Sequence, residues 1–342
     1  MQTLVLEAPG RLITKETTAP AAPGPGEALV RVHRVGVCGT DLHAFAGNQP
    51  FFTYPRILGH ELGVEVLALG SGVTRLAAGD RCAVEPYLNC GQCIACRRGK
   101  PNCCRSLQVL GVHTDGGHRS RLLVPAAKLH RSARLTFDQL ALVETLGIGA
   151  HAVSRAGLQA GETVAVIGAG PIGLAVMQFA LAAGARVIAV DVSPARLEFC
   201  RDRLGVATLV DARTGDVAAQ LAAATAGDLP TAVFDATGSG KSMNASFAFP
   251  APGGRLIFVG LVQADVSFHD PDFHRRELTV LSTRNALPDD FTHIIGLIES
   301  GRIDTTPWIT HRACLGEVPG AFASWTSPET GVIKAMIEVP AD

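Results

Sequence analysis

Hydrophobic and polar residues alternate along much of the first 145 residues. The alternation is clear in EALVRVHRVGV and in RILGHELGVEVLALG, where β-branched residues take turns with polar ones and Gly and Pro interrupt the runs. Such alternation places successive side chains on opposite faces of a strand, and Gly and Pro mark the turns between strands. We therefore expect residues 1–145 to form mainly β-strands.

The pattern changes at about residue 146, where apolar strands alternate with alanine-rich helices. TVAVIGAG precedes PIGLAVMQFALAAG, RVIAVDV precedes ARLEFCRDRL, and the later apolar runs are TAVFDATG, GGRLIFVG and LTVLSTRNA. This β-α-β order predicts an α/β fold with a doubly wound parallel sheet. A chain of 342 residues suits two domains. We expect one at 1–147, rejoined by 286–342, and the other at 148–285.

The most apolar stretch, residues 164–190, has the length of a membrane span. Four Gly and Pro residues interrupt its first half, and polar residues follow, so a buried strand, turn and helix fit it better. The N-terminus has neither a basic region nor a long apolar one, so no signal peptide is expected. We expect a soluble, cytoplasmic protein.

Composition narrows the choice of partners. Apolar residues make up 47% of the chain and charged residues 18%, which is typical of a globular protein and not of a disordered one. The 30 basic and 31 acidic residues nearly cancel. No strong field exists to attract nucleic acid or an anionic membrane, so a small molecule is the expected partner.

A glycine motif, GAGPIG, follows the apolar run 163–167 and opens an apolar helix. In that context GxGxxG indicates a dinucleotide site, with the pyrophosphate at the helix N-terminus. Asp191 ends the second strand and can accept hydrogen bonds from ribose hydroxyls, which favours NAD over NADP. A helix N-cap is the alternative role for Asp191. Arg196 could reach the 2′-phosphate of NADP, although a solvated helix position is favoured for it.

Five of the nine cysteines lie within fifteen residues. Cys90, Cys93, Cys96 and Cys104 have a spacing that suits a closed tetrahedral zinc site, which leaves no position for a substrate and stabilises a loop. The spacing leaves open an exchange between Cys104 and its neighbour Cys103. Five unrelated loop cysteines are the alternative.

A second, open metal site is predicted from three separate segments. GVCGTDLH, residues 36–43, combines a thiol, a hydroxyl, a carboxylate and an imidazole, although by itself it could be a polar surface turn. GHE supplies His60 and Glu61, and LVETLG supplies Glu144. Cys38, His60 and a carboxylate would make three protein ligands, with a fourth position open for water or substrate.

Taken together, GVCGTDLH, GHELGVEV, the four-cysteine segment, ETLGIGAHA and VIGAGPIG resemble the zinc-dependent medium-chain dehydrogenase/reductase family, which contains alcohol, sorbitol and threonine dehydrogenases. The resemblance covers essentially the entire chain. It implies a GroES-like β-rich catalytic domain built from both ends of the chain and a Rossmann domain between them, with the active site in the cleft. It also implies two zinc ions per chain, one catalytic and one structural, and NAD.

The resemblance implies roles for the metal-site residues. Cys38 and His60 match catalytic zinc ligands, and Glu61 matches a glutamate that can approach the metal in place of water or substrate. Glu144 stands where classical alcohol dehydrogenases have cysteine and polyol dehydrogenases have glutamate, which points to polyols or sugar acids.

Further roles follow from the same match. Thr40 would receive the substrate proton and His43 would pass it towards solvent, whereas Asp41 would bond the turn backbone. An ordinary surface position is the alternative for His43. The expected cofactor-binding residues are Gly168, Gly170, Pro171, Ile172, Gly173, Asp191, Arg196, Thr237, Gly260, Ser282 and Arg284.

The segment 268–286 resembles the sugar-acid branch, which includes L-galactonate and L-gulonate 5-dehydrogenases. A hexonate carries a carboxylate, so its pocket needs a cation. Arg284, beside Asn285, is the favoured candidate, whereas Arg119 and His274 are candidates for which a surface or interface role is the stronger alternative. Phe45, Phe51 and Phe52 either wall the site or belong to the core.

Several alternatives share these motifs. A sorbitol-, galactitol- or threonine-type dehydrogenase would have the same metal and cofactor residues. A nucleotide-binding protein without turnover is a remoter alternative, disfavoured by the intact open metal site. The family resemblance also implies a homodimer or homotetramer.

Overall fold

The computed structural model describes residues 1–49 and 52–340, and it divides into two compact units. Met1–Thr145 and Leu287–Asp342 form the first unit, and Leu146–Ala286 form the second. The boundaries expected from sequence differ from these by one or two residues. Among the described helices, none is long and apolar enough to cross a membrane.

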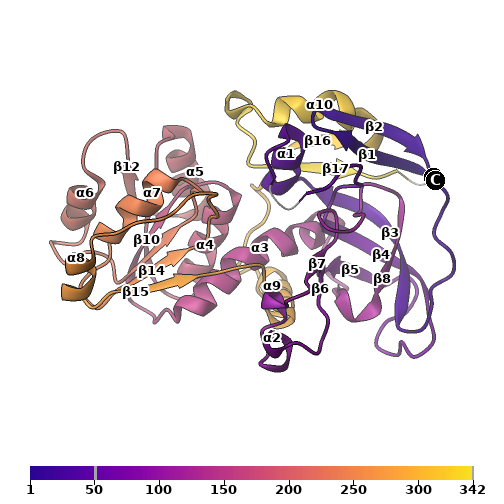
Figure 1. Cartoon of the computed structure of the whole chain (residues 1–342), viewed down its shortest axis with the longest axis horizontal. Coiled ribbons are helices and arrows are strands. Elements are labelled where there is room, and N and C mark those ends of the chain that lie inside the picture. Colours follow the sequence, from indigo (N-terminus) through magenta and orange to yellow (C-terminus); the bar gives the residue numbers. More distant parts are fainter. Residues whose placement is uncertain (50–51, 341–342) are drawn as a thin grey trace. The chain divides into compact units, whose positions relative to one another are not determined.

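The first unit is rich in β-structure. Its main sheet has the order β16-β17-β3-β4-β5-β9, with β8 paired to β3, and two small sheets, β1-β2 and β6-β7, accompany it (Figure 1). The strands are β1 (Gln2–Ala8), β2 (Arg11–Glu16), β3 (Glu27–Gly36), β4 (Glu61–Leu69), β5 (Arg81–Val84), β6 (Tyr87–Leu88), β7 (Gln108–Val109), β8 (Arg121–Pro125), β9 (Leu129–Arg131), β16 (Ile309–Cys314) and β17 (Lys334–Glu338). The helices are α1 (Gly39–Ala46), α2 (Ile94–Arg97), α9 (Pro288–Glu299) and α10 (Val318–Trp325).

Strand β3 shows why the two ends of the chain join. Its burial alternates along most of its length, as the sequence pattern predicts, and β17 pairs antiparallel with its final residues. Residue Ile337 of β17 enters the same apolar core as Val32 of β3 and Leu62 of β4. The C-terminal segment therefore completes a sheet that the N-terminal segment begins.

The second unit contains six parallel strands in the order β12-β11-β10-β13-β14-β15 (Figure 1). This order reverses between β10 and β13, which is the point where doubly wound sheets bind nucleotides. The elements are β10 (Thr163–Ile167), α4 (Pro171–Ala182), β11 (Arg186–Asp191), α5 (Pro194–Leu204), β12 (Thr208–Asp211), α6 (Val217–Ala224), β13 (Ala232–Asp235), α7 (Gly240–Ala245), β14 (Arg255–Phe258), α8 (Asp270–Arg275) and β15 (Thr279–Ser282). Helix α3 (Phe137–Ala156) begins in the first unit and ends in the second.

The α/β fold class with a GroES-like unit and a parallel Rossmann sheet is confirmed. Strand β10 is buried on nearly every residue, as expected for a central strand covered on both faces. The apolar stretch 164–190 thus forms β10, α4 and most of β11, and not a single long helix.

Candidate metal centre and nucleotide site

The turn between β3 and α1 fixes Cys38. Cys38 is the N-cap of α1, and its backbone N–H donates to Oδ2 of Asp41 at 3.0 Å. A carboxylate at the third helical position satisfies a backbone donor that the helix leaves unpaired. Asp41 therefore has the structural role expected for it.

Glu61 begins β4 and His60 directly precedes it, and two nearby glycines, Gly36 and Gly59, lie where a side chain would not fit. A Cβ on Gly36 would lie 2.1 Å from Oε2 of Glu61, and a Cβ on Gly59 would lie 2.6 Å from the ring of His118. Gly59 also has a φ of +94°, which disfavours any other residue. Gly36 is therefore required by the close approach of Glu61, and Gly59 by its backbone conformation and by the nearby ring of His118.

These elements bring Cys38, His60 and Glu61 together. One donor atom from each lies within 4.8 Å of the others, and both His60 and Glu61 are buried. A thiol, an imidazole and a carboxylate are the ligand types that zinc takes in proteins. The donor set therefore fits a zinc ion.

The carboxylate of Asp41 lies close to the imidazole of His60. Its Oδ1 lies 3.8 Å from Nδ1 of His60, and both atoms are buried without a hydrogen-bond partner among the described residues. Burial by itself lowers the pKa of His60, but the negative charges of Cys38, Asp41 and Glu144 raise that pKa well above its usual value. A metal ion would have to displace the resulting proton, so we expect metal binding to release one.

A buried lysine neutralises Glu61. Nζ of Lys334, on β17, donates to both carboxylate oxygens at 2.6 and 2.7 Å, and also to Val37 O and to Thr145 Oγ1 at 3.1 Å each. Burial acts to raise the pKa of Glu61, but the charges of Lys334 and His60 lower it by more. The pKa therefore lies below its usual value, and the carboxyl group stays ionised. Lys334 is thus part of the site, although no local sequence signal marks it.

Glu144 lies beside this group on α3. It is 5% exposed, and its carboxylate Oε1 accepts a hydrogen bond from the Tyr87 hydroxyl at 2.5 Å. Its charge is close enough to His60 to raise the pKa of the imidazole. Burial in turn raises the pKa of Glu144 itself.

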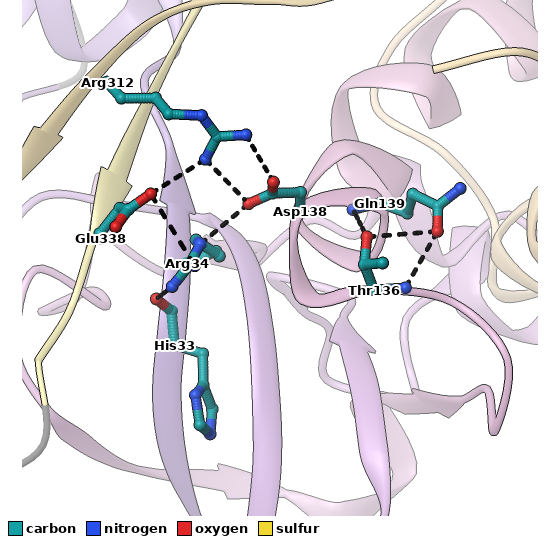
Figure 2. A network of polar contacts seen from close by, with 7 residues as sticks. All are labelled: His33, Arg34, Thr136, Asp138, Gln139, Arg312 and Glu338. Atoms are coloured by element: carbon teal, nitrogen blue, oxygen red, sulfur yellow. Dashed lines mark hydrogen bonds and ion pairs between the residues drawn. The ribbon is translucent and has the colours of Figure 1, made fainter. Parts of the chain in front are cut away.

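Helix α3 is anchored at the end that precedes Glu144. Arg34 of β3 and Arg312 of β16 both donate to Asp138 in the first turn of the helix, and Glu338 of β17 accepts from Arg312 (Figure 2). Thr136 and Gln139 also exchange hydrogen bonds there, at 2.9 and 3.2 Å. Side chains from three strands of the first unit therefore fix where α3 begins.

The predicted proton relay lies on α1. Thr40 is half-buried and His43 is exposed, and residues three apart share one face of a helix. His43 Nδ1 is hydrogen-bonded to Asn48 Oδ1 at 2.9 Å. The imidazole is therefore oriented and accessible to solvent.

The four-cysteine group forms a compact second site. Sγ of Cys93 lies 3.6 Å from Sγ of Cys96, and Sγ of Cys104 lies 3.4 Å from Sγ of Cys90. Tetrahedral Zn–S bonds of about 2.3 Å would place the sulfurs about 3.8 Å apart, so little adjustment is needed. Backbone N–H groups lower the pKa of Cys93 to about 6, which favours the thiolate. Cys103 is exposed and is not part of the group.

The expected cofactor residues lie at the carboxyl ends of the parallel strands. Gly168 follows β10, Thr237 follows β13, Gly260 follows β14 and Ser282 ends β15. A Cβ on Gly173 would lie 1.7 Å from Gly168 O, so this glycine permits the close packing of loop and helix. In residues 1–49 and 52–340, apart from Gly170 itself, its two chain neighbours and the backbone of the helix that it opens, no atom lies within 4 Å of the position that a Cβ on Gly170 would occupy. That open space at the helix N-terminus fits a pyrophosphate.

Asp191 connects the second strand to the glycine loop. Its Oδ2 accepts from Ala169 N at 2.6 Å and its Oδ1 accepts from Ser193 N at 2.7 Å. The N-cap of α5 is Ser193, so Asp191 does not have the alternative role considered for it. The expected position of Arg196 was a solvated one on a helix, whereas its side chain on α5 is half-buried. Burial lowers the pKa of Arg196, although the charge of Asp191 acts to raise it.

The candidate substrate residues are dispersed. Arg119 donates to Gly116 O at 3.0 Å and so bonds within its own loop, which does not favour a role in holding a substrate carboxylate. His274 is exposed on α8 and precedes the amino end of β15, the sheet edge opposite to the nucleotide site, which argues against its expected role. Arg284 and Asn285 follow the carboxyl end of β15.

The structure describes two of the three candidate phenylalanines, Phe45 and Phe52. The ring of Phe45 packs at a tilt against that of Phe322, with 5.2 Å between centroids, and Phe52 packs edge-on against Tyr54 at 4.9 Å. Both rings pack against the apolar core of the first unit, as the alternative interpretation predicted. Phe51 lies outside the described residues.

Comparisons with known proteins agree with this arrangement. Residues 24–134 match the family described as alcohol dehydrogenase GroES-like domain, and residues 171–300 match the family described as zinc-binding dehydrogenase. The chain is 44% identical over 312 residues to L-galactonate-5-dehydrogenase of Escherichia coli (strain K12), with 91% of each chain covered. It is 32% identical over 327 residues to L-threonine 3-dehydrogenase of Pyrococcus abyssi, with 92% of each chain covered.

Two solved structures extend the comparison. The alcohol dehydrogenase rspB of Escherichia coli CFT073, complexed with NADH, has a TM-score of 0.92 and 28% identity, with 99% of each chain covered. A putative zinc-binding dehydrogenase of Sinorhizobium meliloti 1021, bound to NADP, has a TM-score of 0.91 and 30% identity, with 98% of each chain covered. The chain therefore belongs to the zinc-dependent medium-chain dehydrogenase family, as its motifs predicted.

Proposed function

We propose that this chain oxidises a secondary hydroxyl of a sugar acid or polyol to a ketone, with NAD⁺ as hydride acceptor, and that L-galactonate or L-gulonate is the substrate type. The observation that carries the proposal is the buried convergence of Cys38, His60 and Glu61, with Glu144 beside them. The 44% identity to an L-galactonate-5-dehydrogenase supports the choice of substrate.

We assign the following roles to the residues of the metal site in this reaction. Cys38, His60 and a carboxylate hold zinc, which supplies a Lewis acid that lowers the pKa of the substrate hydroxyl. Thr40 receives the hydroxyl proton, and His43, exposed on the same helix face, passes it to water. The Cys90–Cys93–Cys96–Cys104 group holds the structural zinc.

NAD is the proposed cofactor because Asp191 places a carboxylate beside the glycine loop, where a 2′-phosphate would be repelled. The solved relatives bind either form, one NADH and the other NADP. Arg284, which follows β15, remains our candidate for the cofactor edge and for the substrate carboxylate.

We also propose a cytoplasmic homodimer or homotetramer. Free cysteines are kept reduced in the cytoplasm, as a thiolate metal group requires. Strand β15 ends the six-stranded sheet, and Val280 on it is 38% exposed, so pairing of two copies along this edge would bury it. Light scattering of the purified protein measures the assembly.

The test is a substrate screen at fixed NAD⁺, followed by NADH absorbance. We expect L-galactonate or L-gulonate to give the highest kcat/KM, above hexitols, threonine and simple alcohols. A higher value for threonine or a hexitol would reassign the substrate class within the family. No turnover with any of these compounds, in protein that contains zinc at both sites, would contradict the proposal.

A further inference from the structure

Tyr87 is a buried polar residue that the roles above do not use. It lies on β6, it is 3% exposed, and its hydroxyl donates to Oε1 of Glu144 across 57 positions of sequence. The other tyrosine, Tyr54, donates to a backbone carbonyl, that of Ala44, at 2.5 Å. Tyr87 therefore places its hydroxyl on a functional side chain, whereas Tyr54 does not.

The phenol of Tyr87 is fixed on several sides. Tyr87 pairs with Val109 of β7, and its ring packs edge-on against Phe291 of α9, with 6.3 Å between centroids. Its neighbour Glu85 is 1% exposed and is held by Lys128 and by His130. The Tyr87 hydroxyl is the donor in its bond to Glu144, because an ionised carboxylate can only accept.

The two buried carboxylates of the metal site are engaged differently. Both oxygens of Glu61 accept from Lys334, which leaves Glu61 fully paired. Only Oε1 of Glu144 accepts from Tyr87. A carboxylate with one oxygen bonded to a fixed donor has the other oxygen available to a metal.

We propose that Tyr87 is a positioning residue that restricts Glu144 to donating a single oxygen to the metal, so that a coordination position stays open for the hydroxyl groups of the substrate. This inference rests on the proposed function because it takes Glu144 as the carboxylate ligand. It goes further in assigning to β6 the control of how that ligand binds. The hydroxyl of Tyr87 acts through Glu144 and need not contact the substrate.

The experiment compares Tyr87→Phe with Tyr54→Phe, which also removes one tyrosine hydroxyl. Cobalt is exchanged into the Cys38–His60 site while zinc stays in the cysteine group, and the visible ligand-field bands are recorded without substrate or cofactor. These bands weaken as the coordination number of Co²⁺ rises above four. We expect weaker bands in Tyr87→Phe, because both oxygens of Glu144 can then bind, and unchanged bands in Tyr54→Phe.

Activity gives a second readout. We expect kcat/KM to fall roughly 10–100-fold in Tyr87→Phe, the usual effect of removing a hydrogen bond to a metal ligand, and to stay unchanged in Tyr54→Phe. Cobalt bands in Tyr87→Phe that match the unaltered chain would overturn the inference. Unchanged cobalt bands in Glu144→Ala would instead overturn the metal-ligand assignment in the proposed function, so the two failures differ.

A crystal structure of the zinc-loaded, unaltered chain covers the case in which Tyr87→Phe does not fold. The expected result is one oxygen of Glu144 within bonding distance of zinc and the other on the Tyr87 hydroxyl. Two oxygens of Glu144 on the metal, or none, would overturn the inference.

Discussion

Lys334 and Glu61 form a nearly dry ion pair next to the metal ligands, with side chains 2% and 1% exposed. Such a pair adds little net stability compared with apolar residues of the same size, because taking both charges out of water costs about as much as their attraction returns. Removing one partner is a different matter, since the other charge is then buried without compensation. Lys334 and Glu61 should therefore behave as a unit.

At the residue scale we predict that Lys334→Met lowers the free energy of unfolding by about 3–5 kcal/mol, because it leaves Glu61 charged and buried. Urea denaturation measures the change. Lys15→Met is the control, since it removes a lysine from an exposed ion pair with Glu7, and its effect should stay within about 0.5 kcal/mol. The double variant Lys334→Met/Glu61→Gln should recover part of the loss. A single variant as stable as the unaltered chain would show that Glu61 does not depend on Lys334.

A substitution at Gly170 can test cofactor binding without disturbing the fold. Its φ is −75° and its surroundings are open, so alanine fits without strain. We predict that Gly170→Ala folds normally but binds NADH at least about tenfold more weakly, because the methyl group occupies the space of the pyrophosphate. Fluorescence titration measures the affinity. Gly296→Ala, an open glycine on α9, is the control and should leave it unchanged. Equal affinities in both variants would place the phosphates elsewhere.

Local motifs made the metal ligands and the glycine loop predictable, since each lies in a segment of a few residues. Tyr87 and Lys334 were missed because their partners are 57 and 273 positions away in the sequence. No periodicity or spacing marks a residue whose role depends only on tertiary contact. The burial of Tyr87 in a two-residue strand, close to buried Glu85, is visible only in the folded chain.

At the element scale, the start of α3 depends on charges from three strands. Arg34 and Arg312 flank Asp138, and the helix N-terminus adds a further attraction for its carboxylate (Figure 2). Burial raises the pKa of Asp138, but Arg312 and Arg34 together bring it below its usual value. The ion pairs therefore stabilise the folded chain above the ordinary aspartate pKa, and this stabilisation is lost as the pH falls through the lowered pKa.

We predict that Asp138→Asn lowers the free energy of unfolding by about 1 kcal/mol at pH 7, the value being small because the pair is partly exposed to solvent. The difference from the unaltered chain should shrink as the pH falls below about 4, where Asp138 itself becomes protonated. Urea denaturation at several pH values checks this. Asp202→Asn, in a more exposed pair with Arg201, should show a smaller loss and a weaker trend with pH, because solvent screens the pair. A loss that persists at low pH would mean that Asp138 acts by packing and not by charge.

The positions of the substrate residues depend on how helices and strands are arranged in the fold, which the sequence did not show. The run LTVLSTRNA, residues 278–286, predicted a strand correctly, because its apolar pattern is local. It did not show that α8 precedes the amino end of β15, which puts His274 on the wrong edge of the sheet. Arg119 was uncertain for a related reason, since loop carbonyls such as Gly116 O satisfy its guanidinium.

At the scale of the whole molecule, the fold class was predictable and the strand order was not. Strand alternation and β-α-β order could be predicted from the sequence, and so could the return of the C-terminal segment to the first unit. The pairing of β17 with β3 brings Lys334 to Glu61, and only the folded chain shows it. The two metal groups, in contrast, each have their own set of ligands, so they should be lost independently.

Metal counting by mass spectrometry tests this independence. We predict one zinc per chain in Cys104→Ser, because a closed thiolate site needs all four sulfurs. We also predict one in Glu144→Ala, because the open site loses the carboxylate that we propose as its third ligand. The double variant should bind almost none. Cys103→Ser is the matched control for Cys104→Ser, since it alters the exposed neighbour and should keep both ions.

Each count has a distinct meaning because the two groups share no residue. Zinc lost from Cys103→Ser but kept in Cys104→Ser would reverse the assignment of the fourth cysteine. Two zinc ions in Glu144→Ala would show that Glu61 completes the site in its place, which requires the carboxylate to leave Lys334. Loss of both ions from Cys104→Ser would mean that the cysteine group also maintains the open site. The contacts to examine would then be those of Asn89, which donates to Cys96 and accepts from Lys128. Lys128 also donates to Glu85, which lies two residues before Tyr87.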